Sequence, residues 1–142
     1  MGRLITYLTF NGNCRAAMEF YRECLGGKLH LQTLDESDRT DKLPPGMKQI
    51  VVQASLKNDN LLLMGTDMID EELLQGNSVS ILLDCDDMDQ IRAFYAKLKT
   101  GGIATNPLRE SLCGDLLGGL TDKFGNHWLL QCRKRIDKGK NK

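Results

Sequence analysis

The stretch GDLLGGLTDKFGNHWLLQC, from Gly114 to Cys132, decides how the rest of the chain is interpreted. Apolar residues and glycines lead into the sequence KFGN, residues 123–126, and a second extended run, HWLL, follows it. Because Gly125 can adopt the positive φ that a short connection needs, the stretch predicts two antiparallel strands joined by a tight turn. The chain's one tryptophan comes just after this turn, which makes the hairpin the most distinctive local sequence.

The first half of the chain is predicted to be a strand, a helix and three further strands. Residues 4–10 alternate as a strand, and apolar residues between Ala17 and Leu25 recur at helical spacing after a cap offered by Asn11 to Asn13. The pair Gly26–Gly27 should end that helix. The three further strands are predicted at 28–34, 48–56 and 60–66, with an exposed loop at 35–46 and a linker at 67–76.

The same order of elements recurs in the second half. A strand at 78–83 precedes a helix whose apolar residues lie between Met88 and Leu98, with several possible caps in the acidic segment before it. Gly101–Gly102 should end this helix, and it lies 101 − 26 = 75 residues after the first glycine pair. A short strand at 103–105, a loop at Pro107 and the opening hairpin complete the half.

Each half is therefore predicted to be a βαβββ unit, with boundaries of about 4–66 and 78–133 and a flexible tail at 134–142. One such unit leaves a face of its small sheet unburied, and two units side by side can bury it by curling into a half-open barrel. The predicted fold class is α+β, with paired βαβββ units forming a curved, half-open mixed sheet and helices outside. The whole chain, 1–142, is expected to be one domain with a cavity in the mouth of the sheet.

Composition excludes several classes of protein. Nineteen Lys and Arg balance nineteen Asp and Glu, which argues against a nucleic-acid partner. No apolar run approaches the roughly 18 residues that a membrane-spanning helix needs, so no membrane partner is expected. Five cysteines are an odd number without a CxxC spacing, a pattern typical of reduced thiols. These features predict a cytoplasmic protein.

Several motifs together match a known group of proteins. They are YLTFNGNC at 7–14, AMEFY at 17–21 and the first glycine pair, followed near the other end by LTDKFG at 120–125 and by Trp128. With these motifs the chain resembles the vicinal oxygen chelate superfamily, which contains glyoxalases, bleomycin-resistance proteins and extradiol dioxygenases. More narrowly, it is similar to the PhnB-like branch. The resemblance implies paired βαβββ units and a homodimer.

The resemblance also allows a test for the metal that gives the superfamily its name. Members commonly bind a divalent ion with one side chain from the first and last strand of each unit. The matching positions here are Thr6, Leu63 or Met64, Ser80 (Ser78 if the register slips) and Leu129. None offers the carboxylate or imidazole that such ions prefer, so we predict no metal and no other cofactor. PhnB-like relatives also tend to carry a histidine and a tryptophan where this chain has Gln53 and Cys113.

Individual candidates leave alternatives open. Neighbours on a strand face opposite ways, so only one of His127 and Trp128 can face a cavity; tryptophan is the expected lining, and core packing is equally compatible with the sequence. The amide of Gln53 would bond either a ligand or its neighbouring strand. The thiol of Cys113 should lie near the cavity rim, where a passive small residue is favoured over a nucleophile. Glu110 could serve as an acid or base or simply face solvent.

These observations lead to three hypotheses for function. The first is a metal-independent homodimer that binds a small, mainly apolar ligand. The second is a glyoxalase-type lyase, isomerase or dioxygenase, which requires a divalent metal or acid-base work by His127 or Glu110. The third is a structural or regulatory dimer without a ligand, so whether the chain is an enzyme stays open. The predicted ligand-binding residues are Thr6, Leu8, Gln53, Met64, Ser80, Cys113 and Trp128.

Overall fold

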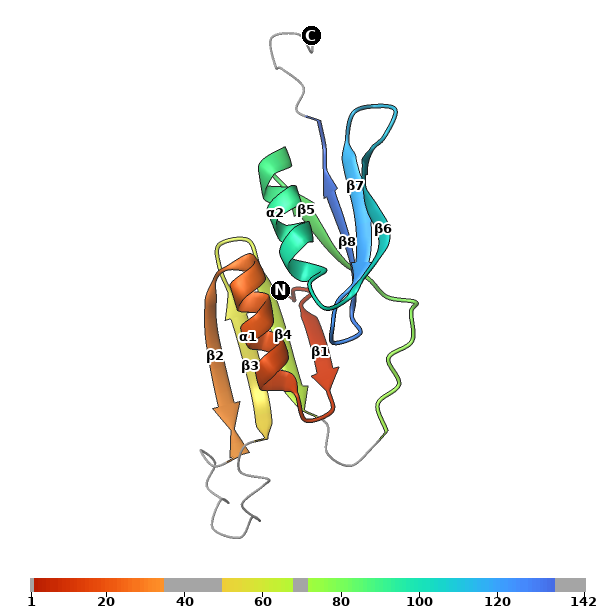
Figure 1. Ribbon diagram of the computed structural model, residues 1–142. Coiled ribbons are helices and arrows are strands. Elements are labelled where there is room, and N and C mark those ends of the chain that lie inside the picture. Colours follow the sequence, from red (N-terminus) through yellow and green to blue (C-terminus); the bar gives the residue numbers. More distant parts are fainter. Residues whose placement is uncertain (1, 35–49, 68–71, 135–142) are drawn as a thin grey trace. The chain divides into compact units, whose positions relative to one another are not determined.

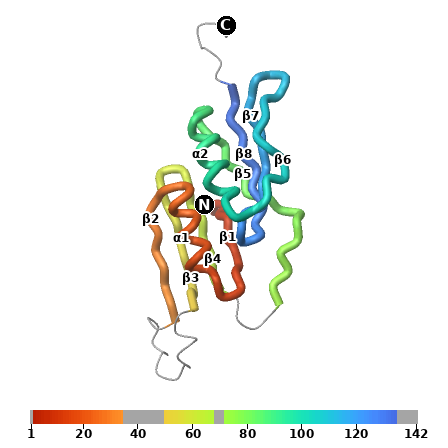
Figure 2. Tube along the Cα trace, in the orientation of Figure 1, coloured from red at the N-terminus to blue at the C-terminus, as the bar shows by residue number. Residues whose placement is uncertain are grey.

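The computed structural model describes residues 2–34, 50–67 and 72–134. It divides into two compact units, Met1–Leu74 and Gln75–Lys142, each with one four-stranded sheet and one helix (Figures 1 and 2). The predicted loop at 35–46, part of the predicted linker at 67–76 and the tail after residue 134 lie outside the described residues.

The first unit has the predicted order of elements. Its sheet has the strand order β1-β4-β3-β2, in which β1 runs parallel to β4 and the other neighbours are antiparallel. The helix packs on β2, β3 and β4, so its apolar residues and one face of the sheet form the core of this unit. The elements are β1 (Thr6–Phe10), α1 (Cys14–Leu25), β2 (Lys28–Thr33), β3 (Val51–Lys57) and β4 (Leu62–Asp67).

The second unit repeats the first. Its strand order, β5-β8-β7-β6, has the same pattern, again with one parallel pair, β5 and β8. The first strands of the two units are offset by 81 − 6 = 75 residues, which confirms the repeat and the α+β fold of paired βαβββ units. The elements are β5 (Ile81–Cys85), α2 (Met88–Leu98), β6 (Ile103–Glu110), β7 (Leu116–Thr121) and β8 (His127–Cys132).

The helix ends are as predicted, with one exception. Gly26 and Gly101 have φ angles of 79° and 78°, the left-handed conformation that ends a helix. Asp87 caps α2 by accepting a hydrogen bond from the Gln90 N–H at 2.7 Å. The exception is the start of α1, because the Asn13 side chain makes no capping bond there.

The cap of α1 comes instead from the end of β4. The buried Asp67 accepts from the Cys14 N–H through Oδ1 at 2.9 Å and from the Val51 N–H through Oδ2 at 3.0 Å. A side chain 53 residues away thus satisfies the first donor of the helix and also holds the start of β3. Asn13 is the N-cap residue, within the predicted cap at Asn11 to Asn13, but a tertiary contact supplies the side-chain acceptor.

The largest correction concerns β6, predicted as a short strand at 103–105 followed by a loop at Pro107. The strand continues to Glu110, with Pro107 inside it. It lies at the edge of the sheet, where the missing N–H of proline is tolerated, and its register with β7 is irregular on both sides of Asn106.

A tyrosine from α2 holds this irregular region. The Tyr95 hydroxyl lies 2.9 Å from the Asn106 carbonyl oxygen of β6 and 2.8 Å from that of Gly119 in β7. Burial raises the pKa of Tyr95, so the hydroxyl stays protonated and remains a donor. The hydroxyl links α2 to β6 and β7 at the point where the backbone pairing between these two strands is interrupted.

We expect the substitution Tyr95→Phe to lower the free energy of unfolding by about 1–2 kcal/mol, because a carbonyl group then loses its buried partner while the ring still fills its space. Urea unfolding followed by the fluorescence of Trp128 measures this loss. The matched control is Tyr7→Phe, since Tyr7 is 53% exposed and its hydroxyl makes no hydrogen bond to the described residues. Equal stabilities of the two variants would contradict the role assigned to Tyr95.

Candidate functional site

The two faces of the second sheet differ sharply. Helix α2 packs on β5, β7 and β8, and the residues facing it are buried, among them Trp128 and Leu130 of β8 and Leu120 of β7. The alternate residues of each strand lie on the side away from α2, which we call the open face. Because Leu129 lies between two core residues on β8, its side chain belongs to the open face.

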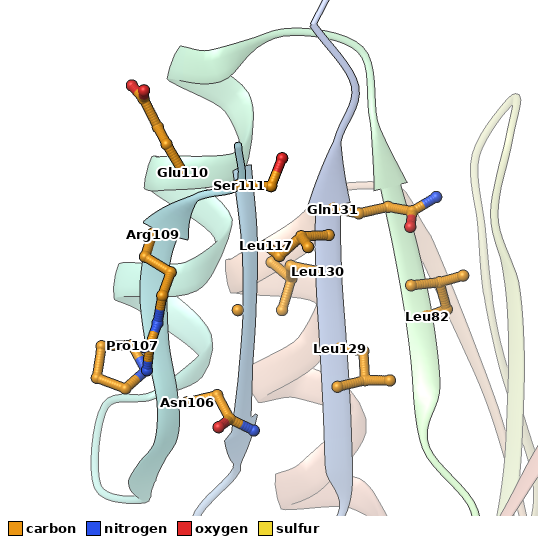
Figure 3. Close-up of a pocket in the computed structure, with 11 residues that line it drawn as sticks. Leu82, Asn106, Pro107, Arg109, Glu110, Ser111, Leu117, Leu129, Leu130 and Gln131 are labelled. Carbon is orange, nitrogen blue, oxygen red and sulfur yellow. The ribbon is translucent and has the colours of Figure 1, made fainter. Parts of the chain in front are cut away.

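A hollow of about 560 Å³ lies on the open face, and all four strands of the second sheet contribute to it (Figure 3). Four of its eleven lining residues are leucines, and five are polar or charged. Those that matter below are Leu82 from β5, Asn106 and Arg109 from β6, Leu117 from β7, and Leu129 and Gln131 from β8.

The register of the strands builds an apolar floor for this hollow. Leu82 pairs with Leu129, and Leu129 with Gly119, so these positions form one row across the open face. Leu82, Leu117 and Leu129 are 53%, 45% and 44% exposed, although leucines usually bury their side chains. A Cβ on Gly119 would lie 3.1 Å from the Leu129 side chain and 3.4 Å from the Asn106 amide nitrogen. The side chains of Leu129 and Asn106 therefore lie close over the buried backbone of Gly119, where they bring the apolar floor and a polar group together.

The polar groups lie along β6 and β8. Arg109 pairs with Leu117, which places it on the open face, and among the described residues its guanidinium has no ion-pair or hydrogen-bond partner. Gln131 donates through Nε2 to Asp84 Oδ1 at 3.1 Å, which leaves its own carbonyl oxygen available. Glu110 also borders the hollow, but Figure 3 shows its carboxylate directed away from the leucines. The site thus combines a hydrocarbon floor with one unneutralised cation.

The predicted lining residue Trp128 lies in the core instead. It is 1% exposed, and its Nε1–H donates to Asp122 Oδ2 at 2.8 Å. The face assignment of the two neighbours is therefore the reverse of the expected one, and His127 occupies the open face. Its Nδ1 lies 2.9 Å from Thr121 Oγ1 and its Nε2 3.1 Å from the Gly76 carbonyl oxygen, so both ring nitrogens are engaged.

Two further predicted residues, Thr6 and Leu8, lie on the helix-facing side of the first sheet. A Cβ added to Gly65 would lie 3.4 Å from the Cys14 sulfur of α1, so Gly65 faces the helix. Leu8 pairs with Gly65 and shares its face, and Thr6 lies two residues before Leu8. Tyr7 and Thr9, the alternate residues of β1, lie on the side of the first sheet away from α1.

The remaining four predicted residues are scattered. Gln53 and Met64 lie on the side of the first sheet away from α1, where the exposed amide of Gln53 needs no protein partner. Ser80 precedes β5 and is exposed. Cys113 is exposed in the turn after β6 and does not border the hollow. The seven residues therefore do not share one face, and their role in binding stays a prediction.

Sequence reasoning missed most of the residues of the hollow. Leu129 is predicted only as a metal position, and Leu82, Leu117, Asn106 and Arg109 are not among the predicted ligand-binding residues. A signal was present in β8: once Trp128 is assigned to the core, strand alternation places Leu129 and Gln131 on the other face. No comparable signal pointed to Arg109, because Pro107 indicated a loop.

The described residues do not provide a metal site. No three His, Cys, Asp or Glu side chains in that part of the chain lie close enough together to hold an ion. At the positions implied by the superfamily, Leu63, Met64 and Leu129 offer only alkyl or thioether groups. Leu129 pairs with Leu82, and Ser80 lies just before β5 begins. This set of donors does not suit a divalent cation.

The buried cysteines are not suited to nucleophilic work. Burial raises the pKa of Cys14 to about 12 and that of Cys85 to about 11, and it also raises the pKa of Cys132. These thiols are therefore protonated at neutral pH, whereas the nucleophile is the thiolate.

No helix in the described residues is long and apolar enough to cross a membrane.

Comparison with known proteins assigns the family. The model of the family described as 3-demethylubiquinone-9 3-methyltransferase matches residues 2–131. The chain belongs to this family.

Solved structures of other proteins agree with this assignment to the 3-demethylubiquinone-9 3-methyltransferase family. The chain is similar to protein PA1353 from Pseudomonas aeruginosa, with 27% identity, a TM-score of 0.81, and coverage of 95% of this chain and 100% of that one. It is also similar to a PhnB protein from Bacillus cereus named as a 3-demethylubiquinone-9 3-methyltransferase, with 22% identity, a TM-score of 0.72, and coverage of 92% and 99%.

A more distant match has the same fold. A glyoxalase/bleomycin resistance protein from Albidiferax ferrireducens T118 has 15% identity and a TM-score of 0.58, with coverage of 93% of this chain and 100% of that one. The fold implied by the resemblance to PhnB-like proteins of the vicinal oxygen chelate superfamily is thereby confirmed.

Proposed function

We propose that the chain binds a small, mainly apolar molecule in the hollow on the open face of its second sheet and uses no metal ion to do so. The observation that supports this most directly is the group of three half-exposed leucines, Leu82, Leu117 and Leu129, on the open face. A cavity of about 560 Å³ is within the range of small-molecule sites, which are mostly apolar with a few polar groups.

Two enzymatic alternatives have less support. A glyoxalase-type reaction needs a metal or a base, yet the imidazole of His127 is engaged at both nitrogens and the carboxylate of Glu110 points away from the hollow. The family description suggests methyl transfer, which requires a group that accepts a proton when the methyl acceptor is a hydroxyl. Among the described residues of the hollow, Glu110 is the one carboxylate, and it is directed elsewhere. Binding without chemistry fits these residues better.

The proposal includes a cytoplasmic homodimer, as the resemblance implies. All five cysteines are free thiols, which supports a reducing compartment. Sedimentation velocity across a range of protein concentrations tests the oligomeric state, and a monomer at all of them would contradict the dimer.

The binding proposal predicts the behaviour of a charge placed on the floor of the hollow. We expect Leu129→Asp to weaken binding of N-phenyl-1-naphthylamine, a neutral apolar fluorescent probe, at least about tenfold, because a carboxylate is costly to desolvate against an apolar molecule. Titration followed by probe fluorescence measures this. The control is Leu112→Asp, because Leu112 is fully exposed in the turn after β6 and outside the hollow. Unchanged binding by the Leu129 variant would contradict the site.

Metal independence has its own test. Protein purified without chelators should contain less than stoichiometric nickel, zinc or iron by elemental analysis, and the probe affinity should be the same after dialysis against a chelator. A stoichiometric metal that is lost together with probe binding would favour the enzymatic alternative.

A further inference from the structure

We infer that the molecule bound in the hollow is an amphipathic organic anion, whose charged group binds Arg109 at the β6 edge while its apolar body covers Leu117 and Leu129. This inference rests on the proposed function and adds the charge and the orientation of the ligand.

The first argument is the unneutralised charge of Arg109. Its register partner is Leu117, and that position is followed across the open face by Gln131, so the nearest neighbours of the arginine on the sheet are neutral. Among the described residues no carboxylate pairs with the guanidinium. A guanidinium presents several N–H donors in a planar fork that fits a carboxylate or a similar oxyanion. A cation at the border of an apolar hollow, with its donors unused, is complementary to an anion with an apolar body.

The second argument is the position of the acidic groups. Asp84 shares the row of Arg109, Leu117 and Gln131 but lies on β5, at the opposite edge of the sheet, and Gln131 Nε2 binds it at 3.1 Å. Three strand spacings separate the two edges, or about 14 Å. Glu110 follows Arg109, but it pairs with Leu116, which is buried on the helix side, and Figure 3 shows its carboxylate directed away. The positive end of the hollow is therefore at β6.

The orientation of the ligand follows from this separation of charges. An anion at the β6 edge avoids the carboxylate of Asp84, and its body then lies over the row of leucines between the edges. Asn106, which also lines the hollow and pairs with Gly119, provides an amide for a second oxygen of the ligand. The reverse orientation would place the negative group beside Asp84 and leave Arg109 unpaired.

Two probes with the same aromatic body provide a direct test. 1-Anilinonaphthalene-8-sulfonate is N-phenyl-1-naphthylamine with one sulfonate added. We expect Arg109→Gln to weaken binding of the sulfonate probe about tenfold and binding of the neutral probe less than about twofold, as loss of one charge-assisted contact implies. Raising the salt concentration from 0.05 to 0.5 M should weaken binding of the anionic probe alone, because the site is partly exposed.

The matched control is Arg92→Gln, which removes the same charge from an exposed position on α2, on the other side of the sheet. It should leave both affinities unchanged, and circular dichroism should show that all the variants are folded. The inference would be overturned if Arg109→Gln weakened binding of both probes equally. It would also be overturned if the parent protein bound the anionic probe no more tightly than the neutral one.

Failure of the proposed function gives a different result. In that case Leu129→Asp would leave binding of the neutral probe unchanged, whatever the Arg109 variant does. A third result is possible as the protein concentration is raised: probe binding could disappear over the same range in which sedimentation velocity shows the chain associating. It would mean that a second copy covers the open face, and the inference of a small anion would then be overturned.

Discussion

The variant Asp122→Ala should lose about 3–5 kcal/mol of its free energy of unfolding, the largest effect that we expect from a single substitution outside the leucine core. Asp122 is 3% exposed, and its carboxylate accepts three hydrogen bonds that together define the hairpin. Oδ1 accepts from the Phe124 N–H at 2.8 Å and from the Asn126 N–H at 3.1 Å, and Oδ2 accepts from the Trp128 indole at 2.8 Å. Alanine would leave all three donors without this acceptor, and the indole is buried.

The measurement is urea unfolding followed by both circular dichroism and the fluorescence of Trp128, because the substitution changes the surroundings of the fluorophore. The Asp122→Asn variant keeps only one of the two acceptor oxygens. Its free energy of unfolding should therefore lie between those of the parent protein and of Asp122→Ala. Asp59→Ala is the control, since Asp59 lies in the exposed turn of the equivalent hairpin and makes no bond to the described residues. A loss below about 1 kcal/mol for Asp122→Ala would show that water replaces the carboxylate and that the turn holds by its backbone alone.

The framework of the chain could be predicted because its signals are local. Helix periodicity, the glycine pairs and the turn at 123–126 each depend on a few adjacent residues, and all were found where expected. The repeat could be recognised in the same way, because the two units have the same order of elements and glycine pairs. Their sheets have the same strand order. Asp122 itself was noticed only as part of a motif. Its bond to the Trp128 indole, at 2.8 Å, joins the turn to β8 within the hairpin.

The faces of the strands were less predictable because alternation has a period of two. An error of one residue moves every side chain of a strand to the other face of the sheet. This happened at β1, where Thr6 and Leu8 were expected in the cavity and Tyr7 and Thr9 lie on the side away from the helix. It happened again at β8, where Trp128 was assigned to the cavity. Burial alone decides such cases, and a single sequence does not report it.

Contacts between distant residues were the other limit. The cap of α1 comes from Asp67, whose role depends on β4 ending beside the start of the helix. Arg109 depends on β6 continuing through Pro107, which is possible only because that strand lies at an edge. Local rules favour a loop at a proline, so the cation of the candidate site was placed outside the sheet. Both errors arise where tertiary structure overrides a local preference.

The second large effect is expected at Gly102, where alanine should cost about 2–4 kcal/mol of unfolding free energy. A Cβ at this position would overlap the carbonyl oxygen of Thr121 and lie 2.9 Å from the Cα of Asp122. These are backbone atoms of the last residue of β7 and of the hairpin turn, so no side chain can move aside. The chain after α2 passes directly against the turn, and only glycine leaves room for it.

The first glycine of the other pair separates this effect from strain of the backbone. Gly26 has a φ of 79° and a ψ of −175°, a conformation essentially restricted to glycine, but no atom lies within 4 Å of an added Cβ, so Gly26→Ala should cost about 1–3 kcal/mol from backbone strain alone. Gly102 has no positive φ, so its cost is purely steric. Urea unfolding of both variants compares the two effects. A loss below about 1 kcal/mol for Gly102→Ala would mean that the hairpin moves to accept the methyl group, and the close approach would then not explain why a glycine occupies position 102.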